Sequence, residues 1–207
     1  MGSLKSFAAG VWIILQLFVA LPAWGQDQLQ RAFQESYRLE AGGDYRQAAG
    51  VLREAYQSDS YEMNLRLGWL YYQAGAMGES IEHYQRAIAL KPYGIEARFG
   101  LALPYSAMGR WDDVSDIYRR ILETDPQNTV ASYRLGLILY NNGQYDRAEP
   151  LLEKVVNLYP FDYDSLLLFA WIKFRLGKTR EARILFNKVL LHTPEDPSAL
   201  EGLSLIK

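Results

Sequence analysis

The strongest constraint on the fold of this chain is an internal repeat with a period of 34 residues. Four glycines recur at that interval, namely Gly75, Gly109, Gly143 and Gly177. Four prolines recur at the same interval, namely Pro92, Pro126, Pro160 and Pro194. A fixed period of this length predicts an array of similar units, each of which buries its apolar face against the next.

Apolar columns between these markers predict two amphipathic helices in every repeat. The first helix carries a bulky column followed by a column of small residues, which are Gly68, Ala102, Gly136 and Ala170. The second helix carries a bulky column made of Tyr84, Tyr118, Leu152 and Phe186. We expect the small residues to let the paired helices approach closely. The recurring glycines should end the first helix in a left-handed conformation, and the prolines should stop the second helix.

Two segments display the whole pattern: LGWLYYQAGAMGESIEHYQRAIALKP at 67–92 and LGLILYNNGQYDRAEPLLEKVVNLYP at 135–160. In the identity and spacing of their small, aromatic, Gly, Ala and Pro positions, both segments resemble tetratricopeptide repeats. The resemblance implies an all-α, right-handed solenoid with a concave groove that is lined by the first helix of each pair. It also implies a protein that binds a partner and does not catalyse a reaction.

Full repeats are expected at 61–94, 95–128, 129–162 and 163–196. A degenerate repeat precedes them at about 27–60, where Ser60 replaces the proline and the join is two residues short, because Gly43 and Gly75 are only 32 residues apart. A capping helix is expected at 197–207. Pro104 falls inside a first helix, where its missing N–H group predicts a kink.

The N-terminus has the composition of a signal peptide. A basic residue precedes an uncharged run of twenty residues, and the small residues Ala23 and Gly25 predict cleavage before Gln26. The mature chain, residues 26–207, is then expected in the periplasm or outside the cell. The alternative is an uncleaved helix that anchors the protein in the inner membrane, because twenty uncharged residues could just span a bilayer.

The composition argues against several classes of function. The chain has 22 Lys and Arg against 24 Asp and Glu, a net charge of −2 that becomes −3 if Lys5 leaves with the leader. The charges are interspersed, so we expect no basic face for nucleic acid. The chain has no Cys, His83 and His192 lie in different repeats, and no nucleophile motif or phosphate loop occurs. We therefore expect no metal, no cofactor and no enzymatic activity.

A second stripe of each first helix adjoins the core column and, in the family that the chain resembles, faces the concave surface. Over the four full repeats, seven of its twelve positions are aromatic. With two residues of the degenerate repeat they form the candidate partner-binding set: Phe33, Tyr37, Trp69, Tyr72, Phe99, Tyr133, Tyr140, Trp171 and Phe174. A candidate polar rim consists of Arg66, Gln73, Arg134, Asn141 and Arg175. The other interpretation of the stripe is packing against the next repeat.

The sequence leaves the class of partner open. The first hypothesis is an exported scaffold whose groove holds a segment of a cell-envelope protein, because aromatic side chains with a polar handle favour binding surfaces. The second is a polysaccharide-associated module, because aromatic rings also stack on sugars and similar arrays occur beside outer-membrane export barrels. The family's clamp for a chaperone's C-terminal carboxylate is not carried over, because apolar residues replace its Lys and Asn. The period and the acidic balance argue against RNA.

Overall fold

A computed structural model describes residues 23–206, with side chains described from Asp27 onward. Residues 1–22 of the expected leader lie outside the described residues. Within the described range the chain forms eleven α-helices and no strands. This confirms the all-α prediction. None of these helices is both long enough and apolar enough to cross a bilayer.

Ten of the helices form five hairpins. The first helices are α1 (Ala23–Ala41), α3 (Tyr61–Gln73), α5 (Glu96–Ala107), α7 (Thr129–Asn141) and α9 (Tyr163–Arg175). Their partners are α2 (Tyr45–Glu54), α4 (Met77–Leu90), α6 (Trp111–Thr124), α8 (Tyr145–Leu158) and α10 (Thr179–His192). The last helix, α11 (Pro197–Leu205), packs on α10 and α9 without a partner of its own.

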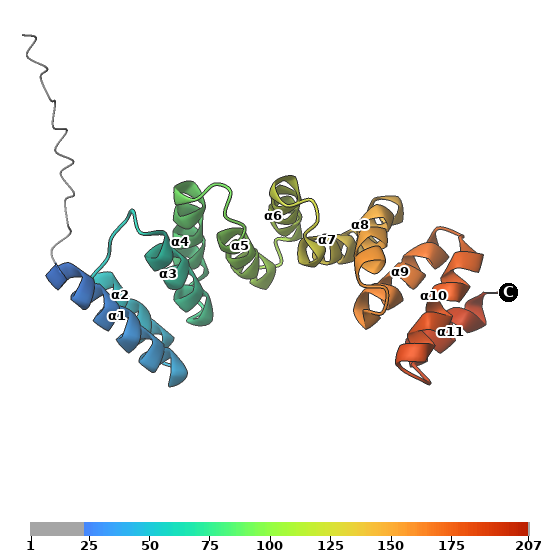
Figure 1. Cartoon of the computed structure of the whole chain (residues 1–207), viewed down its shortest axis with the longest axis horizontal. Coiled ribbons are helices and arrows are strands. Elements are labelled where there is room, and N and C mark those ends of the chain that lie inside the picture. Colours follow the sequence, from blue (N-terminus) through green and yellow to red (C-terminus); the bar gives the residue numbers. More distant parts are fainter. Residues whose placement is uncertain (1–22, 207) are drawn as a thin grey trace, which may run out of the picture.

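The hairpins succeed one another along the molecule, from α1 and α2 at one end to α10 and α11 at the other (Figure 1). Each first helix packs against the second helix of its own hairpin, and each second helix packs against the first helix of the next one. The chain is therefore a solenoid, in which the core is built from contacts between neighbouring units.

The turns follow the repeating glycines and prolines. Five glycines have φ between 70° and 83°, namely Gly43, Gly75, Gly109, Gly143 and Gly177. Each follows a first helix, as predicted, because this left-handed conformation costs a residue with a side chain more than it costs glycine. The prolines each come two residues after a second helix. Ser60, which replaces a proline, caps α3 by accepting a hydrogen bond from the Met63 N–H group at 3.2 Å.

The small residues allow bulky side chains of the second helices to enter the hairpins. A Cβ atom on Gly136 would lie 2.1 Å from Leu152 Cδ2, and one on Gly68 would lie 2.9 Å from the Tyr84 ring. Both distances are shorter than real contacts allow, so glycine is required for this packing. Leu152 and Tyr84 are consequently buried.

The buried residues form one continuous core from Tyr84 to Ile206, a second cluster between the first two hairpins that includes Leu52 and Leu67, and a small third cluster that includes Ala87. The predicted bulky column of the second helices lies within the continuous core and is buried. The helix α5 runs through the buried Pro104, whose carbonyl accepts a hydrogen bond from the Met108 N–H group at 3.1 Å.

Candidate partner-binding groove

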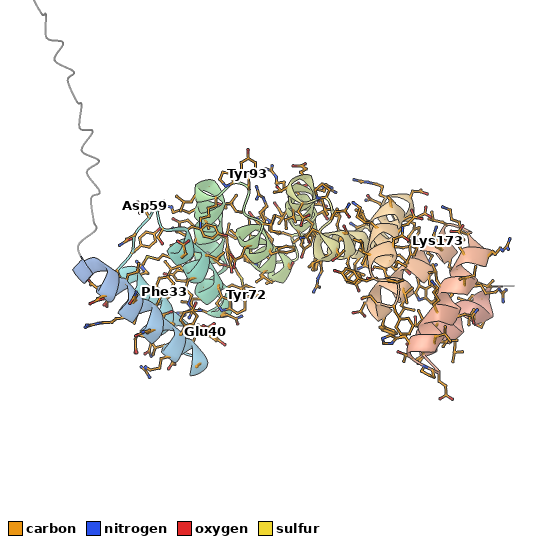
Figure 2. All side chains as sticks on the ribbon, viewed as in Figure 1. Phe33, Glu40, Asp59, Tyr72, Tyr93 and Lys173 are labelled. Atoms are coloured by element: carbon orange, nitrogen blue, oxygen red, sulfur yellow. The ribbon has the colours of Figure 1, made fainter. Side chains whose placement is uncertain are left out.

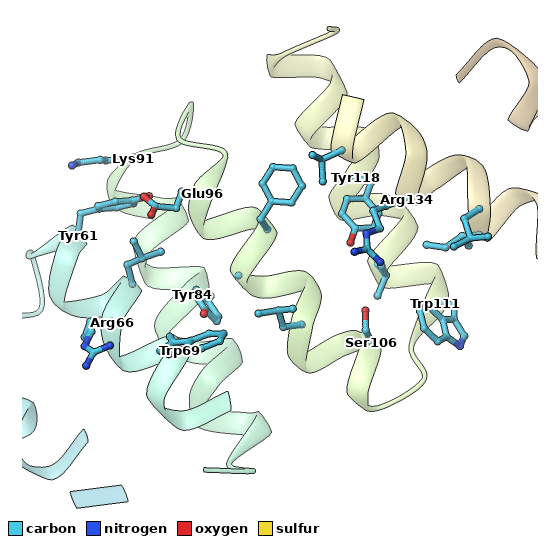
Figure 3. A pocket seen from close by; sticks show the side chains of 18 of the residues that line it. Tyr61, Arg66, Trp69, Tyr84, Lys91, Glu96, Ser106, Trp111, Tyr118 and Arg134 are labelled. Atoms are coloured by element: carbon cyan, nitrogen blue, oxygen red, sulfur yellow. The ribbon is translucent and has the colours of Figure 1, made fainter. Parts of the chain in front are cut away.

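A hollow of about 1280 Å³ lies over the first helices of the N-terminal half of the solenoid. It is lined by side chains of α1, α3, α5 and α7, with contributions from α4 and α6. Figure 3 shows members of the lining from α3 to α7. We call it the N-terminal groove. Its apolar lining includes Phe33, Leu65, Trp69, Phe99, Leu103 and Leu137. The repeat pattern produces this surface because the same face of each first helix is turned to the same side of the array.

The side chains of the predicted stripe are neither fully buried nor fully exposed. All twelve of its positions in the four full repeats are half-buried, whereas the neighbouring core column is buried. The candidate residues that line the N-terminal groove are Phe33, Tyr37, Trp69 and Phe99. The other candidates, which do not line it, are Tyr72, Tyr133, Tyr140, Trp171 and Phe174.

The C-terminal part of the stripe packs against neighbouring helices. The Trp171 Nε1–H group donates to Ser198 Oγ on α11 at 2.9 Å. The Trp171 ring also meets Phe186 and Phe174 edge-on, with centroid distances of 5.1 and 5.6 Å. The Tyr140 ring lies 5.4 Å from that of Tyr145. Tyr140, Trp171 and Phe174 therefore contact other aromatic or polar side chains of the solenoid and remain half-buried.

Only some residues of the candidate polar rim line the N-terminal groove. Arg134 and Asn141 line the N-terminal groove and are exposed. Gln73 and Arg175 do not line it. Arg66 lines the groove, but its side chain is only 8% exposed, so it belongs to the packed wall of the groove and not to its solvent-facing edge.

Arg66 joins the first two hairpins through a polar network. Its Nη1 atom lies 2.5 Å from Glu40 Oε2, and its Nη2 atom donates to Ser36 Oγ at 3.1 Å. The Trp69 Nε1–H group donates to the other oxygen of Glu40 at 2.5 Å. The Arg66 guanidinium also lies 3.8 Å from the centre of the Tyr37 ring. Glu40 therefore holds the indole of Trp69 in place at the wall of the groove.

Several groove residues were not identified from the sequence. Tyr84 was assigned only to the core, yet it also lines the groove from α4. Trp111 begins α6 and is 52% exposed, which makes it the most exposed aromatic side chain of the lining except Tyr37. Residues at helix starts carry no periodic signal, so only the unusual exposure of a tryptophan could have marked Trp111.

Burial and neighbouring charges shift the pKa values of two tyrosines in the groove. The Tyr61 hydroxyl donates to Glu96 at 3.4 Å, and Lys91 lies 3.0 Å from Glu62. Burial, and then the charge of Glu96, raise the pKa of Tyr61. Burial and the same carboxylate also raise the pKa of Tyr84. Both phenols are therefore neutral hydrogen-bond donors at physiological pH.

The groove has the chemistry of a binding surface. Its apolar centre is bordered by a few polar groups that can orient a bound molecule. In the part of the chain that the structure describes, no three His, Cys, Asp or Glu side chains are grouped closely enough to hold a metal ion.

Comparisons with known proteins identify the family of the fold. Two family models, each described as tetratricopeptide repeat, match residues 33–95 and residues 105–167 and 139–205. No curated protein matches the chain. A tetratricopeptide repeat protein from Parabacteroides merdae has a similar structure, with a TM-score of 0.73, 22% identity and coverage of 85% of this chain and 71% of that chain.

Two further solved structures have the same architecture. A MamA protein gives a TM-score of 0.69 at 20% identity and covers 81% of this chain and 92% of its own. YrrB, described as a TPR protein with an unusual peptide-binding site, gives 0.70 at 15% identity and covers 88% of this chain and 95% of its own. These likenesses show the fold alone. Together, the matched repeats span most of the sequence, and the chain belongs to the tetratricopeptide repeat family.

Proposed function

We propose that this chain is a non-catalytic scaffold that binds a segment of a partner protein in the N-terminal groove. The observation that carries the proposal is the groove itself, a hollow of about 1280 Å³ lined by aromatic and aliphatic side chains of four successive first helices. A surface of this kind on a soluble domain marks an interaction site. Leu65, Leu103 and Leu137 favour apolar protein side chains over a sugar, which needs many hydrogen-bonding partners.

We further propose that the protein is exported and meets its partner in the cell envelope. The support is the uncharged N-terminal run and the small residues before Gln26. Cleavage there would leave all of α1 except its first three residues. N-terminal sequencing of the exported protein should begin at Gln26. A form that begins at Met1 and fractionates with membranes would favour the alternative of a retained anchor.

Site-specific photo-crosslinking in the producing cells tests the proposed binding site. A benzophenone amino acid replaces Trp111, which lines the groove and is 52% exposed. The matched control replaces Tyr93, which is 86% exposed on the turn after α4 and does not line the groove (Figure 2). We expect a protease-sensitive adduct from position 111 and none from position 93.

Two other outcomes would contradict the proposal. An adduct from position 93 alone would place the binding surface outside the groove. An adduct from position 111 that resists protease but yields to glycosidases would identify a polysaccharide ligand, which is the alternative raised by the aromatic stripe.

A further inference from the structure

Charged side chains at the N-terminal groove differ in whether they already have partners. Arg66 is paired with Glu40 at 2.5 Å, and Lys91 is paired with Glu62 at 3.0 Å. Among the residues that the structure describes, Arg134 is the one cation of the lining that forms no ion pair within 4.0 Å. Its charge is therefore available to a ligand.

Arg134 is placed where a bound segment would meet it. It extends from α7, is exposed, and lies close to the Tyr118 side chain in the groove (Figure 3). Burial raises the pKa of both Tyr118 and Tyr133, and the nearby charge of Arg134 opposes that rise in each. A guanidinium at the edge of an apolar surface, with no acidic partner in the described residues, is suited to pairing with a ligand carboxylate.

The floor of the groove carries a second polar group without a partner. The Tyr84 ring is buried between Gly68 and Gly100, and its side chain reaches the groove lining. Within residues 27–206 no hydrogen bond to its hydroxyl is found, and the causes of its raised pKa include burial and charge but no hydrogen bond. A ligand that displaces water from this hydroxyl must supply an acceptor, because an unpaired buried donor is unfavourable.

Glu96 distinguishes one edge of the groove from the other. It lies beside Tyr61 on the α5 side, away from Arg134 on α7 (Figure 3). A ligand carboxylate would be repelled by Glu96 and attracted by Arg134. The lining also contains the apolar side chains of Trp69, Phe99 and Leu103.

Given the proposed function, we infer that the groove accepts an apolar protein segment that carries an acidic side chain at one end. The acidic side chain pairs with Arg134, and apolar side chains of the segment cover Trp69, Phe99 and Leu103. The Tyr84 hydroxyl donates a hydrogen bond to a backbone carbonyl of the segment. The charge of Glu96 sets the register by keeping the acidic end away from α5.

Selection from a displayed library of random 12-residue peptides on the purified protein tests this inference. The variant is Arg134→Glu, and the matched control is Arg120→Glu, which makes the same charge change on an exposed side chain of α6 outside the groove. Wild type and the control should enrich apolar peptides with Asp or Glu at one fixed position. Arg134→Glu should lose that preference, and peptides selected on wild type should bind it about fivefold more weakly.

The outcomes separate the inference from the proposed function. If apolar peptides are enriched with no acidic preference, or if both variants enrich the same acidic peptides, the groove binds protein segments but Arg134 does not select them, and the inference is overturned. If none of the three proteins enriches apolar peptides, the proposed function is contradicted together with the inference.

Tyr84→Phe tests the second contact without changing the shape of the ring. Because the hydroxyl makes no hydrogen bond to the described side chains, its removal should leave the melting temperature the same or raise it. The affinity for the selected acidic peptide should fall about threefold to tenfold. Tyr105→Phe, on a buried tyrosine outside the groove lining, should leave the affinity unchanged. Equal affinities of Tyr84→Phe and wild type would overturn the Tyr84 contact.

Discussion

At the scale of single residues, glycines determine where the large side chains of the second helices fit. A Cβ atom on Gly100 would lie 2.1 Å from Tyr84 Cε1, and one on Gly202 would lie 2.3 Å from Phe186 Cζ. Each of these rings is therefore packed onto the backbone of the next hairpin or of the cap. The same contact fixes Tyr84 in the floor of the N-terminal groove, so packing and the binding surface share this residue.

Gly100→Ala should lower the free energy of unfolding by about 1–2 kcal/mol, because the added methyl group forces the Tyr84 ring to move and the gain in helix propensity offsets only part of that cost. The matched control is Gly50→Ala, since Gly50 also lies inside a helix but has open space around its Cβ position. That change should leave the stability unchanged or raise it by up to about 1 kcal/mol. Urea unfolding measures both. A Gly100→Ala protein as stable as wild type would show that Tyr84 can repack freely.

At the scale of elements, an ion-pair network joins α8, α9 and α10. The Lys173 side chain is only 7% exposed, and its Nζ atom lies 2.6 Å from both Glu149 and Glu181 (Figure 2). Lys178 also lies 2.6 Å from Glu149. Burial alone would raise the pKa of Glu149, but hydrogen bonds from Lys173 and Lys178 and their charges outweigh it and lower the pKa.

A lowered carboxylate pKa stabilises the folded state above the ordinary value of 4.5, and this contribution is lost as the pH falls through the lower folded value. Glu149→Gln should therefore reduce stability at pH 7 by about 1–3 kcal/mol, because Lys173 keeps only its more exposed partner. The difference from wild type should shrink below about pH 4. Thermal unfolding at pH 7 and pH 3.5 measures it. A difference that is the same at both pH values would show that the ionised pair contributes nothing.

At the scale of the whole molecule, the repeating contacts were predictable and the unique ones were not. The columns that include Leu67 and Tyr84, and turn glycines such as Gly75, follow from periodicity because every unit makes these contacts in the same way. The pairs Arg66–Glu40 and Trp171–Ser198 join residues of neighbouring units that occur only once. The repeat period contains no information about such pairs, so the sequence could not show which residues of the stripe line the N-terminal groove.

Two tryptophans at the same position of different repeats have different neighbours. Trp69 and Trp171 occupy the same repeat position, and each indole N–H group bonds a neighbouring unit. Trp69 lines the N-terminal groove, whereas Trp171 lies against α11 and Phe186. The sequence pattern places both in one stripe, and only their different neighbours show that Trp69 lines the N-terminal groove and that Trp171 lies against the cap.

The most direct test of the N-terminal groove as the binding surface compares Trp69→Ala with Trp171→Ala, measuring melting temperature and affinity for the partner that crosslinks to position 111. Both variants should melt lower, and Trp171→Ala should lose about 2–4 kcal/mol of stability. Only Trp69→Ala should weaken binding, by about 2–4 kcal/mol. If Trp69→Ala binds the partner as tightly as wild type while folded, or if Trp171→Ala alone loses binding, the N-terminal groove is not the binding surface.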